Sequence, residues 1–321
     1  MKKIFLSSLL AALLLIGASA AYAVSGAAPL DSLTHRVDDK SAPAVYFTKD
    51  VSAKGILKVY EALGRKAQGN VGIKLTFESP NGPFLMPEML APLVKQTGGT
   101  FIDSNGLTPP RDQTEGHLKV AAAHGFTAFG PVDVLDAEGI LDLPVNGGKH
   151  LKIHRTGSHF ANYDSIISVV RFKPHHLRAY GGTLKNLSIC LASPSGKCII
   201  HSAGKTDSAY TEPDIEAFIE SMADAVKAAL DAKKDRWAFV NVISAIAPDD
   251  DCSDAVPQGD VGIIASVDPV ALDQAAVDIT FGSAASKEQR EKWEYDHHTR
   301  VLEYAEKIGA GKRNYRLIQI D

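Results

Sequence analysis

The chain has 321 residues, of which 45% are hydrophobic and 22% are charged, and its formal net charge is −4 at neutral pH. This composition is typical of a globular enzyme or binding protein. The basic residues are scattered and form no continuous stripe, which argues against nucleic acid as a partner. Three cysteines allow at most one disulfide within a monomer, and spacing leaves open whether Cys190 and Cys198 form it.

The first 23 residues have the order of parts of a cleavable export signal. A lysine pair precedes an apolar stretch at 9–16, which is shorter than the roughly 20 residues that a membrane-spanning helix needs. We therefore expect a periplasmic or secreted protein with no membrane partner after cleavage, and an uncleaved anchor is the alternative. Residues 24–42 are predicted to be a flexible lead-in, and residues 43–321 to be one family domain with one or two α/β lobes.

Short β-branched runs alternate with helical patterns in the first part of the folded chain. The predicted order is a strand at 44–48, a helix at 53–66, a strand at 71–77, a helix at 87–96 and a strand at 100–103. Gly98 and Gly99 are expected to end the second helix. This order favours a parallel or mixed sheet with helices on its faces.

The middle of the chain is less regular, with strand candidates at 132–135, 151–154 and 166–171. The clearest helix follows, with Thr211 as its cap, Pro213 in its first turn and apolar side chains at helical spacing as far as Leu230.

The last part of the chain is predicted to hold strands at 237–243, 261–266 and 315–320. Asp268 and Pro269 are a cap and first-turn pair that opens one helix. A capping box at 286–289 opens another helix, which stops at Gly309. Taken together, the pattern predicts an α/β fold with a mixed, largely parallel sheet and helices on both faces.

Functional residue types are densest at 173–186, around a Gly-Gly turn that precedes a predicted helix. Backbone N–H groups at Gly181 and Gly182 can point at an anion, and Lys185 can add positive charge. His175 can bind a metal or transfer protons near neutral pH. The alternative is a turn with surface histidines and a solvated lysine.

A second stretch, at 193–198, is similar to a phosphate-binding loop. It lacks the first glycine of that loop, and Cys198 replaces the hydroxyl that would bind magnesium. His201 follows and could face the same cleft as His175. A packed or surface histidine is the alternative.

The third candidate is the acidic loop at 249–252. Its adjacent carboxylates repel one another unless a cation compensates, so the loop is either solvated or binds a metal. It lacks the alternating ligands and closing glutamate of an EF-hand, and the chain has none of the common hydrolase or dinucleotide motifs.

At these residues the chain resembles a family of domains of unknown function, DUF362, whose members are often labelled Fe–S centre proteins. The matching segments follow one another in the same order along most of the chain: 71–77, 102–105, 173–175, 181–186, 196–197 with His201, 248–252, 260–275 and 303–309. The resemblance implies that these segments build one cleft. The expected ligand-binding residues are Lys74, Asn105, Lys173, Gly181, Gly182 and Asn186.

The chain departs from the family at two places. Many relatives carry a ferredoxin-like cysteine module after the histidine that matches His201, and residues 202–211 here contain no cysteine. Where relatives show Asp-Cys-Asp-Cys, residues 249–252 read Asp-Asp-Asp-Cys. A ferredoxin-type cluster needs about four thiolates, so we expect no Fe–S cluster.

Two hypotheses of function remain. The first is an exported metal- or cofactor-binding protein of oxidoreductase type, in which His175, His201, Asp250 and Cys252 hold a divalent transition metal such as zinc, nickel or iron. His175 and Lys185 would be its catalytic groups. The second is a non-catalytic periplasmic binding protein that captures a small anionic molecule. Both hypotheses have a small-molecule partner, and the sequence leaves open whether the protein is an enzyme.

Overall fold

The computed structural model describes residues 29–175, 179–211, 214–244, 259–281 and 299–321. The predicted export signal and the capping box at 286–289 lie outside the described residues. Asp250 and Cys252 also lie outside them.

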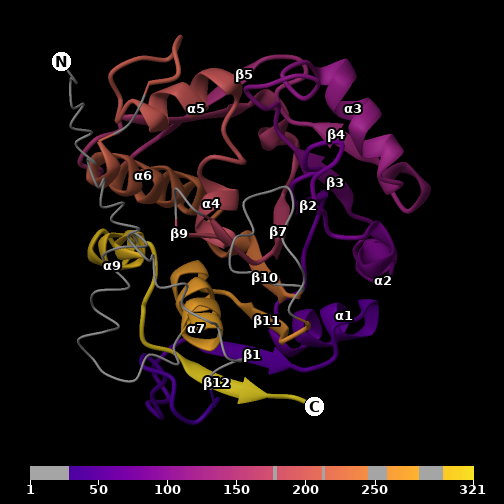
Figure 1. Cartoon of the computed structure of the whole chain (residues 1–321), viewed down its shortest axis with the longest axis vertical. Helices are drawn as coiled ribbons and strands as arrows, with labels where there is room; N and C mark the ends of the chain where they lie inside the picture. The colour runs from indigo at the N-terminus through magenta and orange to yellow at the C-terminus, as the bar shows by residue number, and fades with distance from the viewer. Residues whose placement is uncertain (1–28, 176–178, 212–213, 245–258, 282–298) are drawn as a thin grey trace, which may run out of the picture.

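A single eight-stranded sheet runs through the centre of the described chain, in the order β12-β1-β11-β10-β7-β2-β3-β4 (Figure 1). Neighbouring strands are parallel except where β11 pairs with β1 and with β10. The mixed, largely parallel sheet predicted from the sequence is therefore confirmed. Its strands are β1 (Ala44–Thr48), β2 (Val71–Lys74), β3 (Thr100–Asp103), β4 (Val132–Val134), β7 (Ser165–Arg171), β10 (Trp237–Ile243), β11 (Gly262–Ser266) and β12 (Arg316–Gln319).

Two small antiparallel pairs lie outside the main sheet. They join β5 (Ile140–Pro144) to β6 (Ile153–Gly157), and β8 (Lys173–His175) to β9 (Ala179–Gly181). The second pair carries the Gly-Gly turn into the following helix, so it places that turn beside the end of β7.

Helices cover both faces of the sheet (Figure 1). Among the described residues, no helix combines the length and the apolar character that a bilayer crossing requires. One face carries α1 (Ala53–Ala62), α2 (Ala91–Thr97) and α3 (Thr114–Ala123), and the other carries α4 (Thr183–Leu187), α5 (Pro194–His201), α6 (Ile215–Lys233), α7 (Pro269–Phe281) and α9 (Arg300–Lys307). Short 3₁₀ turns complete the connections at η1 (Pro87–Leu90), η2 (Phe126–Ala128), η3 (Ser158–Asn162) and η4 (Lys234–Arg236).

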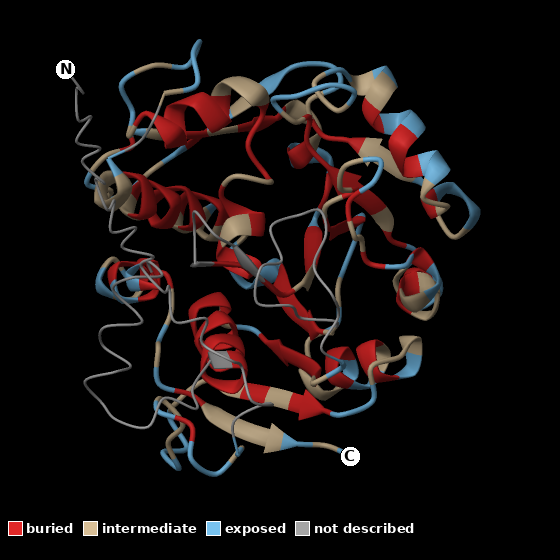
Figure 2. Ribbon diagram, viewed as in Figure 1, coloured by how far each residue is buried: buried red, intermediate tan, exposed pale blue. Residues whose placement is uncertain are grey.

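The sheet separates two hydrophobic cores. Along β10, Trp237 and Phe239 enter the core under α4 to α9, whereas Ala238 and Val240 enter the core under α1 and α2. Successive side chains of a strand point to opposite faces, so a strand covered on both faces is apolar at every position. Figure 2 shows the resulting burial of the central strands and of the helix faces turned toward them.

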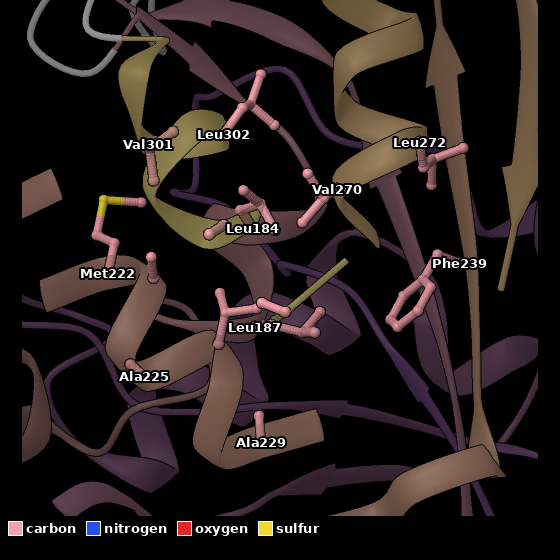
Figure 3. Packing of buried hydrophobic residues seen from close by; sticks show 14 of the residues in the cluster. Leu184, Leu187, Met222, Ala225, Ala229, Phe239, Val270, Leu272, Val301 and Leu302 are labelled. Atoms are coloured by element: carbon pink, nitrogen blue, oxygen red, sulfur yellow. The ribbon is translucent and has the colours of Figure 1, made fainter. Parts of the chain in front are cut away.

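Figure 3 shows the larger core at close range. Leu184 of α4 lies among Met222 of α6, Val270 of α7 and Leu302 of α9, and each of these side chains is at most 5% exposed. A short helix such as α4 is only marginally stable by itself, so this packing holds it in place. The position of α4 matters because the candidate site is built on it.

Element ends differ from the predicted ones for local reasons. Helix α1 ends at Ala62 rather than at residue 66, because Gly64 adopts a left-handed conformation with φ of 64°. Helix α6 is capped by Asp214, whose side chain accepts a hydrogen bond from the N–H of Ala217, and not by Thr211. Strand β2 stops at Lys74 because the next N–H groups bond to the end of β3.

Helix α3 and strand β5 are elements that the sequence did not reveal. Helix α3 buries only His117, Val120 and Ala121, so it has no continuous apolar stripe. Strand β5 buries only Leu143 and is otherwise at least partly exposed. Edges and surface helices of this kind give little periodic signal.

The segment similar to a phosphate loop is part of helix α5. Ser193 caps the helix by accepting a hydrogen bond from the N–H of Gly196. Gly196 permits α5 to lie against β6, since a Cβ atom there would come within 2.1 Å of the Arg155 carbonyl oxygen. Its glycine therefore serves close packing of a helix on a strand.

Candidate functional site

The order of the parallel strands reverses between β2 and β7. From β2 the chain continues to β3 and β4 on one side, and it then returns to β7 and β10 on the other side. In open α/β sheets, ligands bind outside the carboxyl ends of the strands at such a switch point. A cavity of about 250 Å³ lies there, lined by residues that follow β2, β3 and β7 and by α4 and α5.

Positive charge dominates this cavity, which we call the cationic cavity. Among the described residues, five basic and two acidic side chains line it: Arg111, Arg171, Lys173, Lys185, Lys197, Glu78 and Asp103. A cleft with low-dielectric walls and one sign of charge concentrates counter-ions. The electrostatics of the cavity therefore favour an anionic ligand.

A buried ion pair lies beneath the cavity. The Lys74 ammonium at the end of β2 donates to Asp103 Oδ1 at 3.0 Å and to Asn186 Oδ1 at 2.9 Å, and its side chain is fully buried. It also donates to the Leu75 carbonyl oxygen at 2.8 Å. With three acceptors for its three N–H groups, the ammonium is fully satisfied.

Asp103 is held as a carboxylate. Burial raises the pKa of Asp103, but the charge of Lys74 and the neighbouring His117 outweigh burial, and the pKa is well below its usual range. The second carboxylate oxygen accepts the N–H of Phe77 at 3.0 Å and lies 3.2 Å from His117 Nε2. Asp103 thereby ties β2, β3 and α3 together at one point.

Asn186 joins the two strands at the switch point. Its Nδ2 donates to the Lys74 carbonyl oxygen at 3.2 Å and to Ser168 Oγ of β7 at 2.8 Å. Its Oδ1 accepts from the Lys74 ammonium. Because Asn186 belongs to α4, this helix is fixed to β2 and to β7 at once.

The N-terminus of α4 is held by Asp273 of α7. This fully buried carboxylate accepts the N–H groups of Thr183 and Leu184 at 2.8 Å each and Asn241 Nδ2 at 2.8 Å. Burial raises the pKa of Asp273 to about 6, against the effect of these donors. The first two N–H groups of α4, those of Thr183 and Leu184, are therefore bonded to a side chain of the protein itself.

Gly182 is required by the approach of Asp273 to the helix. A Cβ atom at Gly182 would lie 2.7 and 2.8 Å from the two carboxylate oxygens of Asp273. Gly181 has no such conflict, since a Cβ atom there would come no nearer than 3.4 Å to the Lys173 side chain. Gly182 thus allows the turn to pack tightly against Asp273, and both glycines line the cavity.

The structure brings several of the predicted residues together. Lys173, Gly181, Gly182, Lys185 and Asn186 all line the cationic cavity. Two other predicted ligand-binding residues support the cavity without being among those that line it. Lys74 lies in the ion pair beneath it, and the side chain of Asn105 bonds to Thr114 Oγ1 and to His117 of α3.

The residues predicted to hold a metal are only partly described. His201 is 7% exposed and stacks on Phe218 of α6 with ring centroids 4.7 Å apart, and it is not among the residues that line the cavity. His175 ends β8, and its side chain is outside the description. No group of three metal-binding side chains occurs among the described residues. The metal site stays a prediction, which metal analysis of the purified protein tests.

Five charged residues of the cavity were not predicted as site residues from the sequence: Glu78, Asp103, Arg111, Arg171 and Lys197. Asp103 and Arg171 are the last residues of their strands, which is a usable signal because parallel strands end at the same edge of a sheet. Lys197 lies in α5, within the segment at 193–198 that is similar to a phosphate loop, whereas Arg111 lies in a long connection with no local signal.

Cys190 and Cys198 are both unbridged. Cys190 lines the cavity, and Cys198 is buried in α5. Burial raises the pKa of the Cys198 thiol. The two thiols therefore do not form the disulfide that their spacing allowed.

His154 of β6 contacts the C-terminal end of α4. Its titration predicts how the stability of the protein depends on pH. Its ring is fully buried and bonds through Nε2 to the Leu187 carbonyl oxygen at 3.1 Å. Burial lowers the pKa of His154 to about 4. The pKa of His154 is therefore lower in the folded state than in the unfolded state. Its contribution to the free energy of unfolding is present above pH 6.5 and is lost as the pH falls toward 4.

Between pH 7.5 and pH 5 we expect this histidine to cost the wild-type protein about 2 kcal/mol of unfolding free energy. His154→Gln keeps an N–H donor and cannot titrate, so it should escape that loss. Urea unfolding of both proteins at the two pH values measures the difference. An equal loss in wild type and variant would show that His154 is not the group that titrates.

Comparison with known proteins gives one family and several remote structural likenesses, two of which follow. The model of the family described as Domain of unknown function (DUF362) matches residues 71–278. No curated protein matches the chain. Among solved structures, the lactate racemase apoprotein from Thermoanaerobacterium thermosaccharolyticum is 13% identical with a TM-score of 0.45 and covers 74% of this chain. A Thermotoga maritima protein from structural genomics is 13% identical with a TM-score of 0.46 and covers 78%. The chain spans 57% and 59% of those two proteins, less than two thirds of either.

Proposed function

We propose that this chain, which belongs to the DUF362 family, binds a small carboxylate anion in the cationic cavity. The observation that carries the proposal is the excess of basic over acidic side chains around a cavity of about 250 Å³ at the strand-order reversal. Cavities for drug-sized molecules are about 300–1,000 Å³. The cavity lies just below that range, so it suits a small ligand.

The acidic groups at the cavity do not cancel its charge. Asp103 already forms an ion pair with Lys74, whose side chain is buried beneath the cavity. Glu78 lies 3.9 Å from Lys173, measured between Oε1 and Nζ. Among the described residues that line the cavity, the five basic side chains still outnumber these two acidic ones. Arginine binds a carboxylate through two parallel N–H groups, which gives orientation as well as affinity.

A larger hollow, of about 700 Å³, lies at the opposite edge of the sheet. It is lined by the starts of β7 and β10 and by the segment that follows α1. Arg65 there donates to the Trp237 carbonyl oxygen, so one of its basic groups is already bonded to the main chain. The amino ends of parallel strands are also not where α/β proteins bind ligands. The cationic cavity is therefore the better candidate.

The test is a calorimetric titration with oxamate, an unreactive carboxylate, and with inorganic phosphate as a second arm. We expect oxamate to bind and Lys185→Met to weaken binding by about tenfold or more, because a hydrogen bond to a charged group contributes about 1.5–3 kcal/mol. Tighter binding of phosphate than of oxamate would move the ligand class from carboxylates to phosphates.

Lys119→Met is the matched control for this experiment. It also removes one lysine charge, but Lys119 is exposed on α3 and pairs with Glu115 of the same helix. We expect its oxamate affinity to equal that of the wild type. An equal loss of affinity in both variants would mean that net charge alone attracts the anion and that the cavity is not the site.

A further inference from the structure

Lys197 is a buried amine in the wall of the cationic cavity. It belongs to α5, lines the cavity and is 7% exposed. Its Nζ donates to the Asn105 carbonyl oxygen at 2.6 Å and to the Ala192 carbonyl oxygen. Both acceptors are main-chain carbonyl groups without formal charge, so neither is a counter-ion for an ammonium.

The number of acceptors suits a neutral amine. A neutral lysine has two N–H bonds and one lone pair, and the two carbonyl oxygens take both N–H bonds. The lone pair is then left over as a nucleophile or a base. Lys74 differs in this respect, because its three acceptors use all three N–H groups of an ammonium and include the Asp103 carboxylate.

The surroundings of Lys197 also favour the neutral form. Burial lowers the pKa of Lys197 to about 8, and the nearby charge of Lys74 adds to that effect. Cys190, Asp103 and Asp136 act in the opposite direction and are outweighed. About a tenth of the amine is then neutral at pH 7, far more than for a solvated lysine with a pKa of about 10.4.

We propose that Lys197 forms an imine with the carbonyl group of a small 2-oxo carboxylate held in the cationic cavity. This inference rests on the proposed function, because the anion site must hold the carboxylate. A desolvated lysine close to other cations is the kind that forms Schiff bases with carbonyl substrates. In a 2-oxo acid the carboxylate and the carbonyl carbon are adjacent, so one small molecule can engage a basic side chain and the amine together.

The step needs no further reactant. The lone pair of Nζ attacks the carbonyl carbon, and one of the two protons on Nζ passes to the carbonyl oxygen as the carbon–oxygen double bond becomes single. The resulting carbinolamine loses its hydroxyl group and the N–H proton as one molecule of water. A carbon–nitrogen double bond remains, and no electron is gained or lost overall.

The test is reductive trapping of the full chain with pyruvate and cyanoborohydride at pH 7.5, where the reagent supplies the hydride that fixes the imine. We expect intact mass to show one reduced pyruvate adduct per chain and peptide mapping to place it on Lys197. Lys119, an exposed lysine, is the internal comparison and should stay unmodified under the same conditions. An adduct spread over exposed lysines, or no adduct, would overturn the inference.

Lys197→Arg keeps the positive charge and the N–H donors but has no nucleophilic amine. We expect it to lose the adduct, because a guanidinium group does not attack a carbonyl carbon. Reductive trapping of the wild-type protein tests the imine by itself, so the inference can still be tested if Lys197→Arg does not fold. Oxamate binding without trapping would reject only the imine, whereas absence of oxamate binding would reject the proposed function.

Discussion

Asp103→Leu is expected to lower the free energy of unfolding by about 3–5 kcal/mol, because it leaves the Lys74 ammonium buried without its carboxylate. Both side chains are almost fully inaccessible, and the distance between Nζ and Oδ1 is 3.0 Å. The variant also removes the acceptor of the Phe77 N–H group. Urea unfolding at pH 7 measures the loss.

The double variant Lys74→Met with Asp103→Leu separates the ion pair from simple loss of packing. Replacing a buried pair by apolar side chains is often neutral, so the double variant should recover at least about 2 kcal/mol relative to Asp103→Leu. The exposed pair Glu115 and Lys119 on α3 gives the control, and its double replacement should leave stability unchanged. A double variant as unstable as the sum of its single variants would show that the two charges do not interact.

Asp273→Ala is the second change with a large expected effect. It removes the acceptor of three buried donors, namely the N–H groups of Thr183 and Leu184 and the side chain of Asn241. Unsatisfied buried donors cost about 1–3 kcal/mol each, and we expect a total loss of about 3–5 kcal/mol because the site relaxes in part. Chemical denaturation measures this loss directly.

Asp273 also offers a functional readout, since α4 carries Lys185 and Asn186. We expect Asp273→Ala to weaken oxamate binding at temperatures where the protein is still folded. Asp273→Asn retains one acceptor oxygen and should fall between wild type and Asp273→Ala in both stability and affinity. If stability falls while oxamate affinity is unchanged, α4 does not depend on Asp273 for its position.

The sheet was largely predictable from the sequence because its central strands are short, apolar and β-branched. Strands β1 and β3 have the predicted bounds, and β10 reads as one apolar run because both of its faces are covered. Strand β5 is mostly exposed and helix α3 lacks an apolar stripe, so neither has a pattern to find. The sequence-based predictions therefore failed for elements at the surface of the fold and not for the central strands.

The site was predictable only where its residues are close together in the sequence. Lys173 and Lys185 were identified as parts of one cluster, and both line the cavity. Arg171 and Lys197 were not, because their role depends on β7 and α5 meeting beside β2, which no local pattern encodes. The metal site predicted from donor types stays a prediction, because Asp250 and Cys252 lie outside the described residues.

The buried contacts that hold α4 and the side chains that line the cationic cavity belong to different parts of this fold. Asn186 and Asp273 fix α4 through buried hydrogen bonds, and those contacts serve the architecture whatever the ligand is. Arg111, Lys173 and Cys190 belong to connections and to the small hairpin above the strand ends. Exchanging the side chains at these positions would change the lining of the cavity without removing the buried hydrogen bonds that fix α4.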